Sequence, residues 1–394
     1  MKARLHFLVV LCLLTVIGYG QKLKINSGKI AQSNYYEVID FELVNEKIKI
    51  PVTINNKVYY FMLDTGAPNL ISKRVADDIN LQNKTSIVTT DANNNKSTLE
   101  MGALESIKLG TLDFQDNVVL ISDLDNHPLL KCYKIDGLIG SNFFKNSILK
   151  ISLKERKIWV TDKIKNLNIK TPASKLSLIG EQQSPYIPIS FLNDSGNKGS
   201  EHLMIDTGMD GFYEISKRVY KLIAKEKFFK ELSSSSGSGS VGLFGASTEK
   251  EQFLLQTNYF KVNETVFSNV ITTTTEDNNS RIGFDLLKHG DITLDFKNKK
   301  FYFESNPNIT LSEKVPVYAA TFMNNKLSVG FVWSSSYRNQ LNYGDEIVRM
   351  GNYTLSELDL CDILKLKNFR KENPSYEMEI KTKENKTVLI KIEN

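Results

Sequence analysis

Short stretches of alternating apolar and polar residues run through most of the chain, and they predict an all-β protein with few helices. The segment KIKIPVTINNKVYYFMLD at 47–64 alternates about an Asn-Asn turn, which is typical of a β-hairpin. The segment ESIKLGTLDFQDNVVLI at 105–121 alternates in the same way about a glycine. Ser72 and Ser216 are each followed by residues that favour helices, and serine is a good N-cap residue. One short helix is therefore expected after each serine.

Much of this pattern occurs twice. Asp64 and Asp206 each end an apolar run and each begin Asp-Thr-Gly, 142 positions apart. Three later stretches repeat at nearly the same interval: ISKRVADDI at 71–79 with ISKRVYKLI at 215–223, DGLIGSNFF at 136–144 with SRIGFDLL at 280–287, and ILKISLKERKIWV at 148–160 with DITLDFKNKKFYF at 291–303. A fixed long period of this kind predicts two copies of one domain, related by approximate twofold symmetry.

A single Asp-Thr-Gly is weak support for chemistry, because such a turn often holds an aspartate that caps its own backbone. Two copies at equivalent positions are different, because a twofold axis would bring Asp64 and Asp206 together. Two adjacent carboxylates cannot both ionise, so they share one proton and supply one acid and one base. That pair suits hydrolysis of an amide by activated water, without a metal or a covalent intermediate.

With these motifs the chain resembles the aspartic peptidases, the group of pepsin and the retroviral-type proteases. The resemblance rests on FMLDTGA and LMIDTGM and on the later segments GLIG at 137–140 and RIG at 281–283, and it covers about 45 to 305. It implies a bilobal fold with the active site inside one monomer. It also implies that Asp64 and Asp206 are the catalytic pair. Their loops would be supported by Thr65, Gly66, Thr207 and Gly208, and the absence of a side chain at Gly140 and Gly283 would leave space for the loops.

Two features depart from the family pattern. Pepsin-like enzymes carry a hydroxyl residue after Asp-Thr-Gly, whereas this chain carries Ala67 and Met209. With fewer hydrogen-bond donors to the charged carboxylates, the pKa values of the pair should be higher. We therefore expect an activity optimum at weakly acidic to near-neutral pH. The segments at 88–104 and 232–247 are the expected flaps; the Ser/Gly run at 233–240 is either a mobile flap or a spacer loop.

After about residue 308 the repeat ends and a third unit begins. It resembles a PDZ domain in Leu341, Gly344-Asp345, Ile347 and Gly351, preceded by an apolar strand and followed by a helix with a capping box of Ser356 and Asp359. The resemblance implies that a peptide could add as a strand beside one set of residues: Val329, Gly330, Phe331 and Val332. The alternative is a degenerate unit that buttresses the protease or fills its own groove.

The first twenty residues have the layout of a secretory signal peptide, with Lys2 and Arg4, an apolar run and a small-residue end. We therefore expect export to a periplasmic or extracellular location; a membrane anchor is the alternative. Without residues 1–20 the chain has 48 basic and 45 acidic residues, a net charge of +3 that gives no reason to expect nucleic acid as partner.

Cysteine and histidine usage adds two expectations. Cys132 and Cys361 lie far apart and in different expected domains, so no disulfide framework is predicted and Cys361 is expected to be a core residue. The histidines outside the signal segment lack the spacing of a zinc site, and no phosphate-binding glycine loop precedes a helix. We expect no metal and no cofactor.

The sequence thus predicts an exported aspartic endopeptidase that acts on peptide or protein substrates, with a PDZ-like unit that binds a peptide ligand or substrate. A non-catalytic peptide-binding protein and a PDZ adaptor on the same fold are the alternatives. The expected domains are a signal peptide at 1–20, a first lobe at 21–172, a second lobe at 173–308, and a PDZ-like α+β domain at 309–394.

Overall fold

The structure, a computed structural model, describes residues 23–393 and is 49% strand and 14% helix. This composition agrees with the expectation of a mostly β protein. The expected signal peptide at 1–20 lies outside the described residues. None of the helices between residues 23 and 393 combines the length and apolar character that crossing a bilayer would need.

The first Asp-Thr-Gly lies in a nine-stranded sheet, in the order β1-β9-β6-β10-β5-β4-β8-β7 with β3 paired to β4. The predicted hairpin about Asn55 and Asn56 is confirmed, and both asparagines adopt positive φ, as a tight hairpin turn requires. The strands are β1 (Lys29–Ile30), β3 (Glu42–Val44), β4 (Lys47–Ile54), β5 (Lys57–Leu63), β6 (Leu70–Ser72), β7 (Thr85–Thr90), β8 (Lys96–Leu109), β9 (Leu112–Ser122) and β10 (Gly137–Ile139).

The second Asp-Thr-Gly lies in an eleven-stranded sheet, in the order β18-β21-β24-β17-β25-β16-β15-β22-β23-β28 with β14 paired to β15. Its strands are β14 (Ser177–Ile179), β15 (Ser184–Leu192), β16 (Lys198–Ile205), β17 (Tyr213–Ser216), β18 (Lys230–Gly237), β21 (Lys250–Thr257), β22 (Phe260–Val262), β23 (Thr265–Ser268), β24 (Val270–Thr275), β25 (Arg281–Ile282) and β28 (Asn308–Thr310). A separate short hairpin pairs β19 (Val241–Gly242) with β20 (Gly245–Ala246).

A third sheet takes strands from both copies of the repeat. Its order is β13-β27-β26-β11-β12-β2, and the central β11 and β26 pair antiparallel. It holds β2 (Tyr36–Asp40), β11 (Ile148–Ser152), β12 (Lys157–Thr161), β13 (Ser174–Lys175), β26 (Gly290–Asp295) and β27 (Lys300–Ser305). The two predicted strand pairs at 148–160 and 291–303 are confirmed, and one apolar core continues through all three sheets.

The two helices expected after the Asp-Thr-Gly loops are present but differ in their caps. Helix α1 (Lys73–Asp78) is capped as predicted, because the hydroxyl of Ser72 accepts from the Val75 N–H at 3.1 Å. Helix α2 (Lys217–Ile223) lacks a side-chain cap, and the Ser216 hydroxyl is buried without a hydrogen bond. The second cap was therefore wrongly predicted.

The C-terminal strands form a separate six-stranded sheet with its own apolar core. It contains β29 (Tyr318–Met323), β30 (Lys326–Val332), β31 (Glu346–Met350), β32 (Tyr353–Thr354), β33 (Ser375–Lys381) and β34 (Thr387–Glu393). The helix predicted after Ser356 begins later than expected: α3 (Leu360–Lys365) is capped by Asp359, whose side chain accepts from Asp362 N–H, and α4 (Phe369–Glu372) follows. The predicted capping box is thus wrong, since Asp359 is the cap itself.

Eight 3-10 helices connect these elements in the described part of the chain. They are η1 (Leu130–Tyr133), η2 (Ser141–Phe144), η3 (Ile164–Leu167), η4 (Ala224–Glu226), η5 (Phe284–Lys288), η6 (Ser335–Tyr337), η7 (Leu355–Glu357) and η8 (Leu366–Asn368). Two of them, η2 and η5, follow the glycines at 140 and 283, so the equivalence of the two copies extends beyond the sheets.

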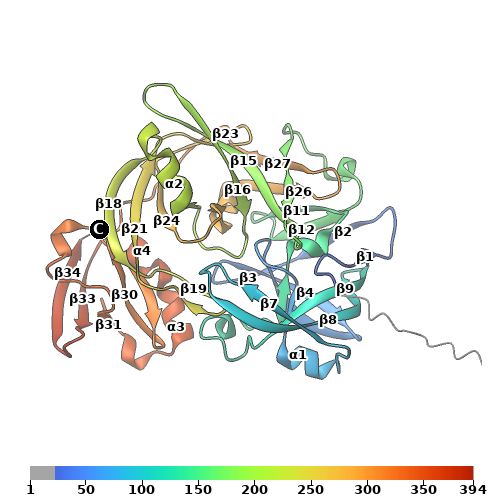
Figure 1. Cartoon of the computed structure of the whole chain (residues 1–394), viewed down its shortest axis with the longest axis horizontal. Coiled ribbons are helices and arrows are strands. Elements are labelled where there is room, and N and C mark those ends of the chain that lie inside the picture. Colours follow the sequence, from blue (N-terminus) through green and yellow to red (C-terminus); the bar gives the residue numbers. More distant parts are fainter. Residues whose placement is uncertain (1–22, 394) are drawn as a thin grey trace, which may run out of the picture.

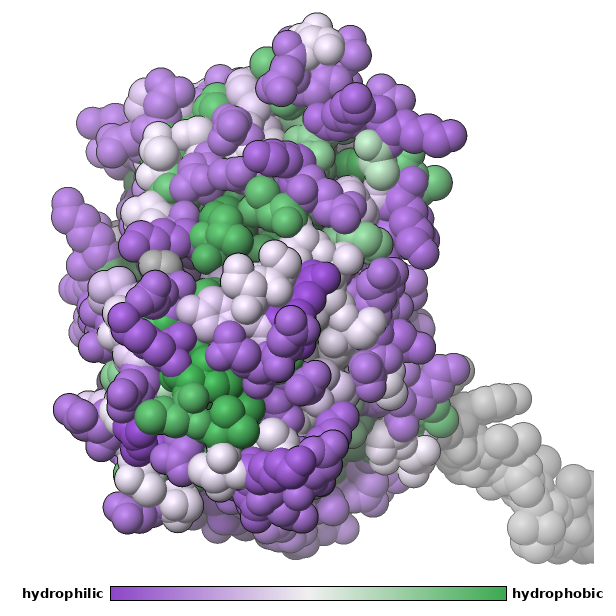
Figure 2. Space-filling view, turned by 90° about the vertical axis from the view of Figure 1, so that its left-hand side faces the viewer, coloured by the Kyte–Doolittle hydropathy of each residue, from purple (hydrophilic) through white to green (hydrophobic). Residues whose placement is uncertain are grey.

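In Figure 1 the C-terminal sheet lies at the lower left, below β18 and β21 of the second large sheet, and the first large sheet lies at the lower right. Phe331 and Trp333 stack on each other with ring centroids 4.9 Å apart and pack against Leu232, Leu254 and Ile271 of the second sheet. On the face that carries the C-terminal strands, apolar side chains form small groups separated by polar ones (Figure 2). Apolar areas of that kind are ordinary on a protein surface and do not indicate a further docking site.

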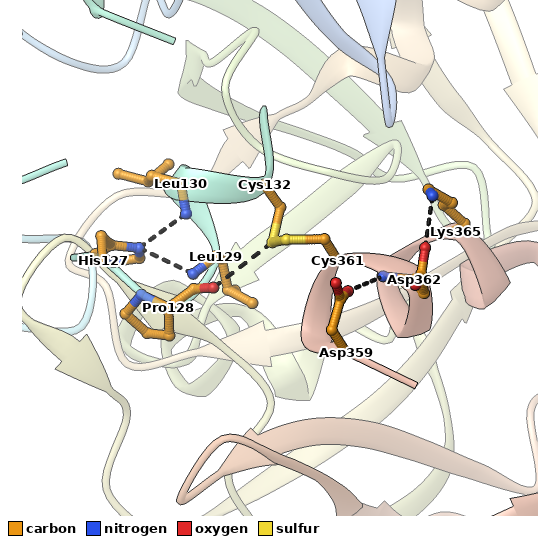
Figure 3. The surroundings of a disulfide bond; sticks show 9 residues. All are labelled: His127, Pro128, Leu129, Leu130, Cys132, Asp359, Cys361, Asp362 and Lys365. Atoms are coloured by element: carbon orange, nitrogen blue, oxygen red, sulfur yellow. Dashed lines mark hydrogen bonds and ion pairs between the residues drawn. A yellow bond between two sulfur atoms is a disulfide. The ribbon is translucent and has the colours of Figure 1, made fainter. Parts of the chain in front are cut away.

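A disulfide joins Cys132 in η1 to Cys361 in α3 across 229 positions of sequence (Figure 3). The expectations of no disulfide and of a core role for Cys361 were therefore wrong. Neither residue has a local signal for its partner, because the contact arises only when the C-terminal unit packs against the first large sheet. The bond fixes the C-terminal unit covalently to the part of the chain that carries Asp64.

A half-buried ionic contact joins three parts of the molecule. Glu46, in the turn between β3 and β4, pairs with Lys288 of the second copy and Lys367 of the C-terminal unit, both at 2.6 Å. Burial alone would raise the pKa of Glu46, but hydrogen bonds from the two lysines lower it to about 2. One carboxylate therefore holds the C-terminal unit and both copies of the repeat together.

We predict that replacing both disulfide cysteines by serine lowers thermal stability without preventing folding. Closing a loop of 229 residues restricts the unfolded chain, so the loss should be roughly 2–5 kcal/mol. The measurement is the unfolding midpoint of wild type and of Cys132→Ser/Cys361→Ser, each with and without reductant. Reductant should lower the wild-type midpoint to that of the variant and leave the variant unchanged. Two readily labelled thiols in the unreduced wild type would contradict the disulfide.

Candidate active site

The two aspartates follow equivalent strands and lie in equivalent loops. Asp64 comes directly after β5 and Asp206 directly after β16. Their backbone N–H groups donate to Ile139 O at 3.0 Å and Ile282 O at 2.9 Å, which are the last residues of β10 and β25. Because β10 and β25 run parallel to β5 and β16, each loop is held in place by a neighbouring strand end.

The threonines of the two loops exchange hydrogen bonds across the axis that relates the copies. The Thr65 hydroxyl donates to Ile205 O at 2.6 Å and accepts from Thr207 N–H at 3.1 Å. The Thr207 hydroxyl donates to Leu63 O at 2.9 Å and accepts from Thr65 N–H at 3.1 Å. Both threonines are buried, so these four bonds fix the distance between the two loops.

Glycine is required at four places around the carboxyl groups because there is no space for a Cβ atom. A Cβ on Gly66 would lie 2.5 Å from Asp206 Cγ, and one on Gly208 would lie 2.4 Å from Asp64 Cγ. A Cβ on Gly140 would lie 2.2 Å from Ala67 O, and one on Gly283 would lie 2.6 Å from Gly211 O. The structure thus brings together all eight residues that the Asp-Thr-Gly motifs and the later glycines indicated.

The two carboxyl groups face each other's loops at close range, since the glycine of each Asp-Thr-Gly lies against the carboxyl group of the opposite loop. Burial, followed by the charge of Asp206, raises the pKa of Asp64 to about 7. Oδ1 of each aspartate also accepts a backbone N–H at 3.0 Å, from Gly66 for Asp64 and from Gly208 for Asp206. The pair therefore offers one acid and one base at near-neutral pH.

Two side chains donate hydrogen bonds to the glycine carbonyls of the Asp-Thr-Gly loops, and the sequence analysis missed both. Lys47, buried at the start of β4, donates to Gly208 O at 2.6 Å and pairs with Asp210 at 2.5 Å. In the second copy Gln182, two residues before β15, donates from Nε2 to Gly66 O at 2.9 Å. Strand alternation alone would have placed Lys47 with the other lysines of its strand, so the local pattern gave no reason to single it out.

Arg281 is a third side chain that the sequence analysis missed as a site residue. It lies on β25, and its guanidinium contacts Asp206 directly, with Nη1 3.3 Å from Oδ2. The segment RIG at 281–283 corresponds to LIG at 138–140 in the first copy. An arginine therefore stands where the first copy has Leu138. Comparing the two copies position by position would have found it.

Hairpins from both copies contact each other at the segments expected to be flaps. The tip of the β7–β8 hairpin contacts the β19–β20 hairpin: Asp91 accepts from Phe244 N–H at 2.9 Å, and Asn93 Nδ2 donates to Gly245 O at 3.0 Å. The histidine His127, next to the disulfide loop in Figure 3, bonds Gly242 O through Nε2 at 3.0 Å. The expected flap segments are thus hairpins that hold each other, and the alternative of a spacer that touches nothing is wrong.

The strand expected to bind a peptide is covered by the chain itself. Val329, Gly330, Phe331 and Val332 of β30 are all buried. Val332 N–H donates to the Ser235 hydroxyl at 3.0 Å, and a Cβ on Gly330 would lie 2.5 Å from Ser238 O. The Ser/Gly run expected to be flexible forms much of β18 and packs on β30, so no open groove exists along these four residues.

Comparison with known proteins supports peptidase chemistry at the level of a family. Residues 50–143 match the family model described as aspartyl protease. The matched segment contains the first Asp-Thr-Gly and Gly140 but not the second copy. No curated protein matches the chain.

We predict that Thr65→Val or Thr207→Val lowers both stability and any activity of the pair. Valine keeps the shape but removes two cross-loop hydrogen bonds and leaves a buried carbonyl and N–H unpaired, a loss of roughly 2–4 kcal/mol. Thermal unfolding and activity should be measured together. Thr272→Val, which removes one buried bond to Tyr213 O away from the carboxyl groups, is the control and should retain activity. Unchanged stability in both loop variants would contradict the role of these bonds.

Proposed function

We propose that this protein is an aspartic endopeptidase whose active site lies within one chain, between two lobes that each contribute one Asp-Thr-Gly. The observation that carries the proposal is the placement of Asp64 and Asp206 on two equivalent loops that Thr65 and Thr207 join, each loop lying against the carboxyl group of the other. The proposed lobes are the units around the first and second large sheets, about 21–172 and 173–308. The aspartyl protease match over 50–143 supports the first of them.

The reaction needs one ionised and one protonated carboxyl group. The carboxylate takes a proton from water as the water oxygen bonds to the peptide carbonyl carbon, and the carboxylic acid gives its proton to the carbonyl oxygen. When the C–N bond of the neutral gem-diol breaks, the newly protonated carboxyl gives its proton to the leaving nitrogen. The other carboxylate takes a proton back from a gem-diol hydroxyl, and the pair returns to its first state.

The proposed substrate is an extended peptide segment that lies between the carboxyl groups and the two hairpins. Polar contacts join these hairpins to each other, such as Asn93 with Gly245 and Ser240 with Asn93 at 2.6 Å. Surface polar bonds of this kind exchange readily for water, so the hairpins can separate to admit a chain.

We infer that the C-terminal unit is a PDZ-like domain and that its present role is to support the protease. The disulfide, the Glu46 contacts and the stacked Phe331 and Trp333 all attach it to the two proposed lobes. A peptide ligand at 329–332 would first have to displace β18 and Ser238. A cavity of about 630 Å³ elsewhere in the unit, beside Arg349, Tyr353 and Phe369, lies apart from the carboxyl groups.

We also propose export through the signal peptide at 1–20 into a periplasmic or extracellular space. The disulfide supports this location, because such bonds persist in oxidising compartments and are rare in the cytosol.

We predict cleavage of internal bonds in a diverse peptide library by the chain from residue 21 onward. Asp64→Asn and Asp206→Asn should each reduce the rate by at least about a thousandfold, since each removes one half of an acid–base pair. Lys288→Gln, which changes a lysine paired with Glu46, is a control for general damage and should retain activity. A wild type that binds peptides but cuts none would favour the non-catalytic binding protein instead.

We predict that the cleavage rate falls as the pH rises above about 7, roughly tenfold per unit. The raised pKa of Asp64 keeps the shared proton in place below that pH, and the proton is lost above it. The measurement is kcat/KM from pH 3 to 9. A maximum near pH 2, or full activity at pH 9, would contradict the assignment.

A further inference from the structure

One pair of facing residues differs between the two copies at a position next to the carboxyl groups. In the first large sheet Leu138 of β10 lies opposite Leu70 of β6. At the equivalent register in the second sheet, Arg281 of β25 lies opposite Glu214 of β17. Both leucines and Arg281 are buried and Glu214 is half-buried, so an ion pair with a buried guanidinium replaces an apolar pair in one copy only. Burying charge is costly unless the charge is well paired, so this difference needs an explanation.

The guanidinium of Arg281 is shared by three carboxylates. Its Nη2 lies 2.8 Å from Glu214 Oε2, its Nη1 lies 3.3 Å from Asp206 Oδ2, and its Nε lies 3.8 Å from Asp277 Oδ2. Nε is buried and makes no hydrogen bond, so the Asp277 contact is ionic only. Glu214 thus aims the arginine, and one of its two terminal nitrogens reaches the proposed catalytic carboxyl.

The two aspartates therefore have different sets of donors. Asp206 accepts from Gly208 N–H and Met209 N–H, both at 3.0 Å, and from the charged guanidinium. Among the bonds found for Asp64, the backbone donor is Gly66 N–H, and Leu138 cannot donate at the place where Arg281 stands. Donors to the charged form of a carboxyl favour that form, so the geometry favours the negative charge on Asp206.

The other charged and titratable groups around the two aspartates do not make their surroundings equal. Lys47 on β4 lowers the pKa of Asp64 by its charge, but burial and the charge of Asp206 outweigh it, and its Nζ is bound to Gly208 O and to the carboxylate of Asp210. Glu214 on β17 and Asp277 face Asp206 with Arg281 between them. The phenols of Tyr133 and Tyr186 are buried, and burial raises the pKa of each, so both stay neutral.

We propose that Arg281 is a positioning residue that makes the two carboxyl groups unequal: it holds Asp206 as the ionised base and leaves the shared proton on Asp64. Asp206 then takes the proton from water, and Asp64 protonates the carbonyl oxygen. This inference rests on the proposed peptidase function for its role in catalysis, but the unequal proton placement is a property of the folded chain and can be measured without substrate.

The decisive variant is Arg281→Leu/Glu214→Leu, because it gives the second copy the Leu-Leu pair that the first copy already has. It removes one positive and one negative charge, so the net charge does not change. Arg281→Lys is the conservative partner, since it keeps a positive charge beside Asp206 if the double variant folds poorly. Leu70→Ile, in the equivalent pair of the first copy, controls for altered packing at the same register.

The first measurement is carboxyl ¹³C NMR titration of Asp64→Asn, which leaves Asp206 alone, and of Asp206→Asn, which leaves Asp64 alone. We expect Asp206 to titrate at least one pH unit below Asp64. Adding Arg281→Leu/Glu214→Leu should reduce the gap to less than half a unit, whereas adding Arg281→Lys should keep most of it. Equal midpoints with Arg281 present, or a gap that the double substitution leaves unchanged, would overturn the proposal.

The second measurement is the pH profile of kcat/KM. We expect Arg281→Leu/Glu214→Leu to lose about tenfold more activity at pH 4 than at pH 6.5, because without the guanidinium the pair takes up its second proton at a higher pH. Leu70→Ile should change the rate by the same factor at every pH. A uniform loss in the double variant would show a structural role only and overturn the proposal. If no peptide is cleaved, the proposed function fails, and the NMR titration still decides the proton placement.

Discussion

The exchange of hydrogen bonds between Thr65 and Thr207 is the constraint on which the rest of the site depends. Each hydroxyl serves both as donor and as acceptor for the opposite loop, so neither loop is complete without the other. This closeness explains the glycines, because each loop approaches the opposite carboxyl group too closely for a side chain at 66 or 208. On the far side, pairing of β11 with β26 joins the same two units through backbone bonds.

The C-terminal unit further restricts how the two large sheets can move relative to each other. It reaches the first large sheet through the disulfide, both copies through Glu46, and the second large sheet through Phe331 and Trp333. The chain between β18 and β21 leaves this contact directly and forms the β19–β20 hairpin, which bonds the β7–β8 hairpin of the first sheet. The position of the β19–β20 hairpin is therefore tied at its base to the packing of the C-terminal unit.

Features determined by neighbouring residues could be predicted from the sequence. The Asn55-Asn56 hairpin, the strand pairs about charged turns and the Ser72 cap each depend on a few adjacent side chains, and all are present. The repeat also allowed one long-range prediction. Because two copies of one domain are expected to pack about a twofold axis, the sequence predicted that Asp64 and Asp206 lie together. The aspartyl protease match covers the first of the two Asp-Thr-Gly motifs.

Features that arise between distant surfaces could not be predicted in this way. The partner of Cys132 lies 229 positions away, the cover on Val329–Val332 comes from β18, and burial of Lys47 depends on a carbonyl of the opposite copy. Arg281 is the exception, since its charge breaks a repeat that is otherwise apolar at that position. A duplicated frame makes two carboxyl groups equivalent by construction, and a general acid and a general base cannot be equivalent. Any difference must come from neighbours that the duplication did not preserve, and in this chain those neighbours are Arg281 and Glu214.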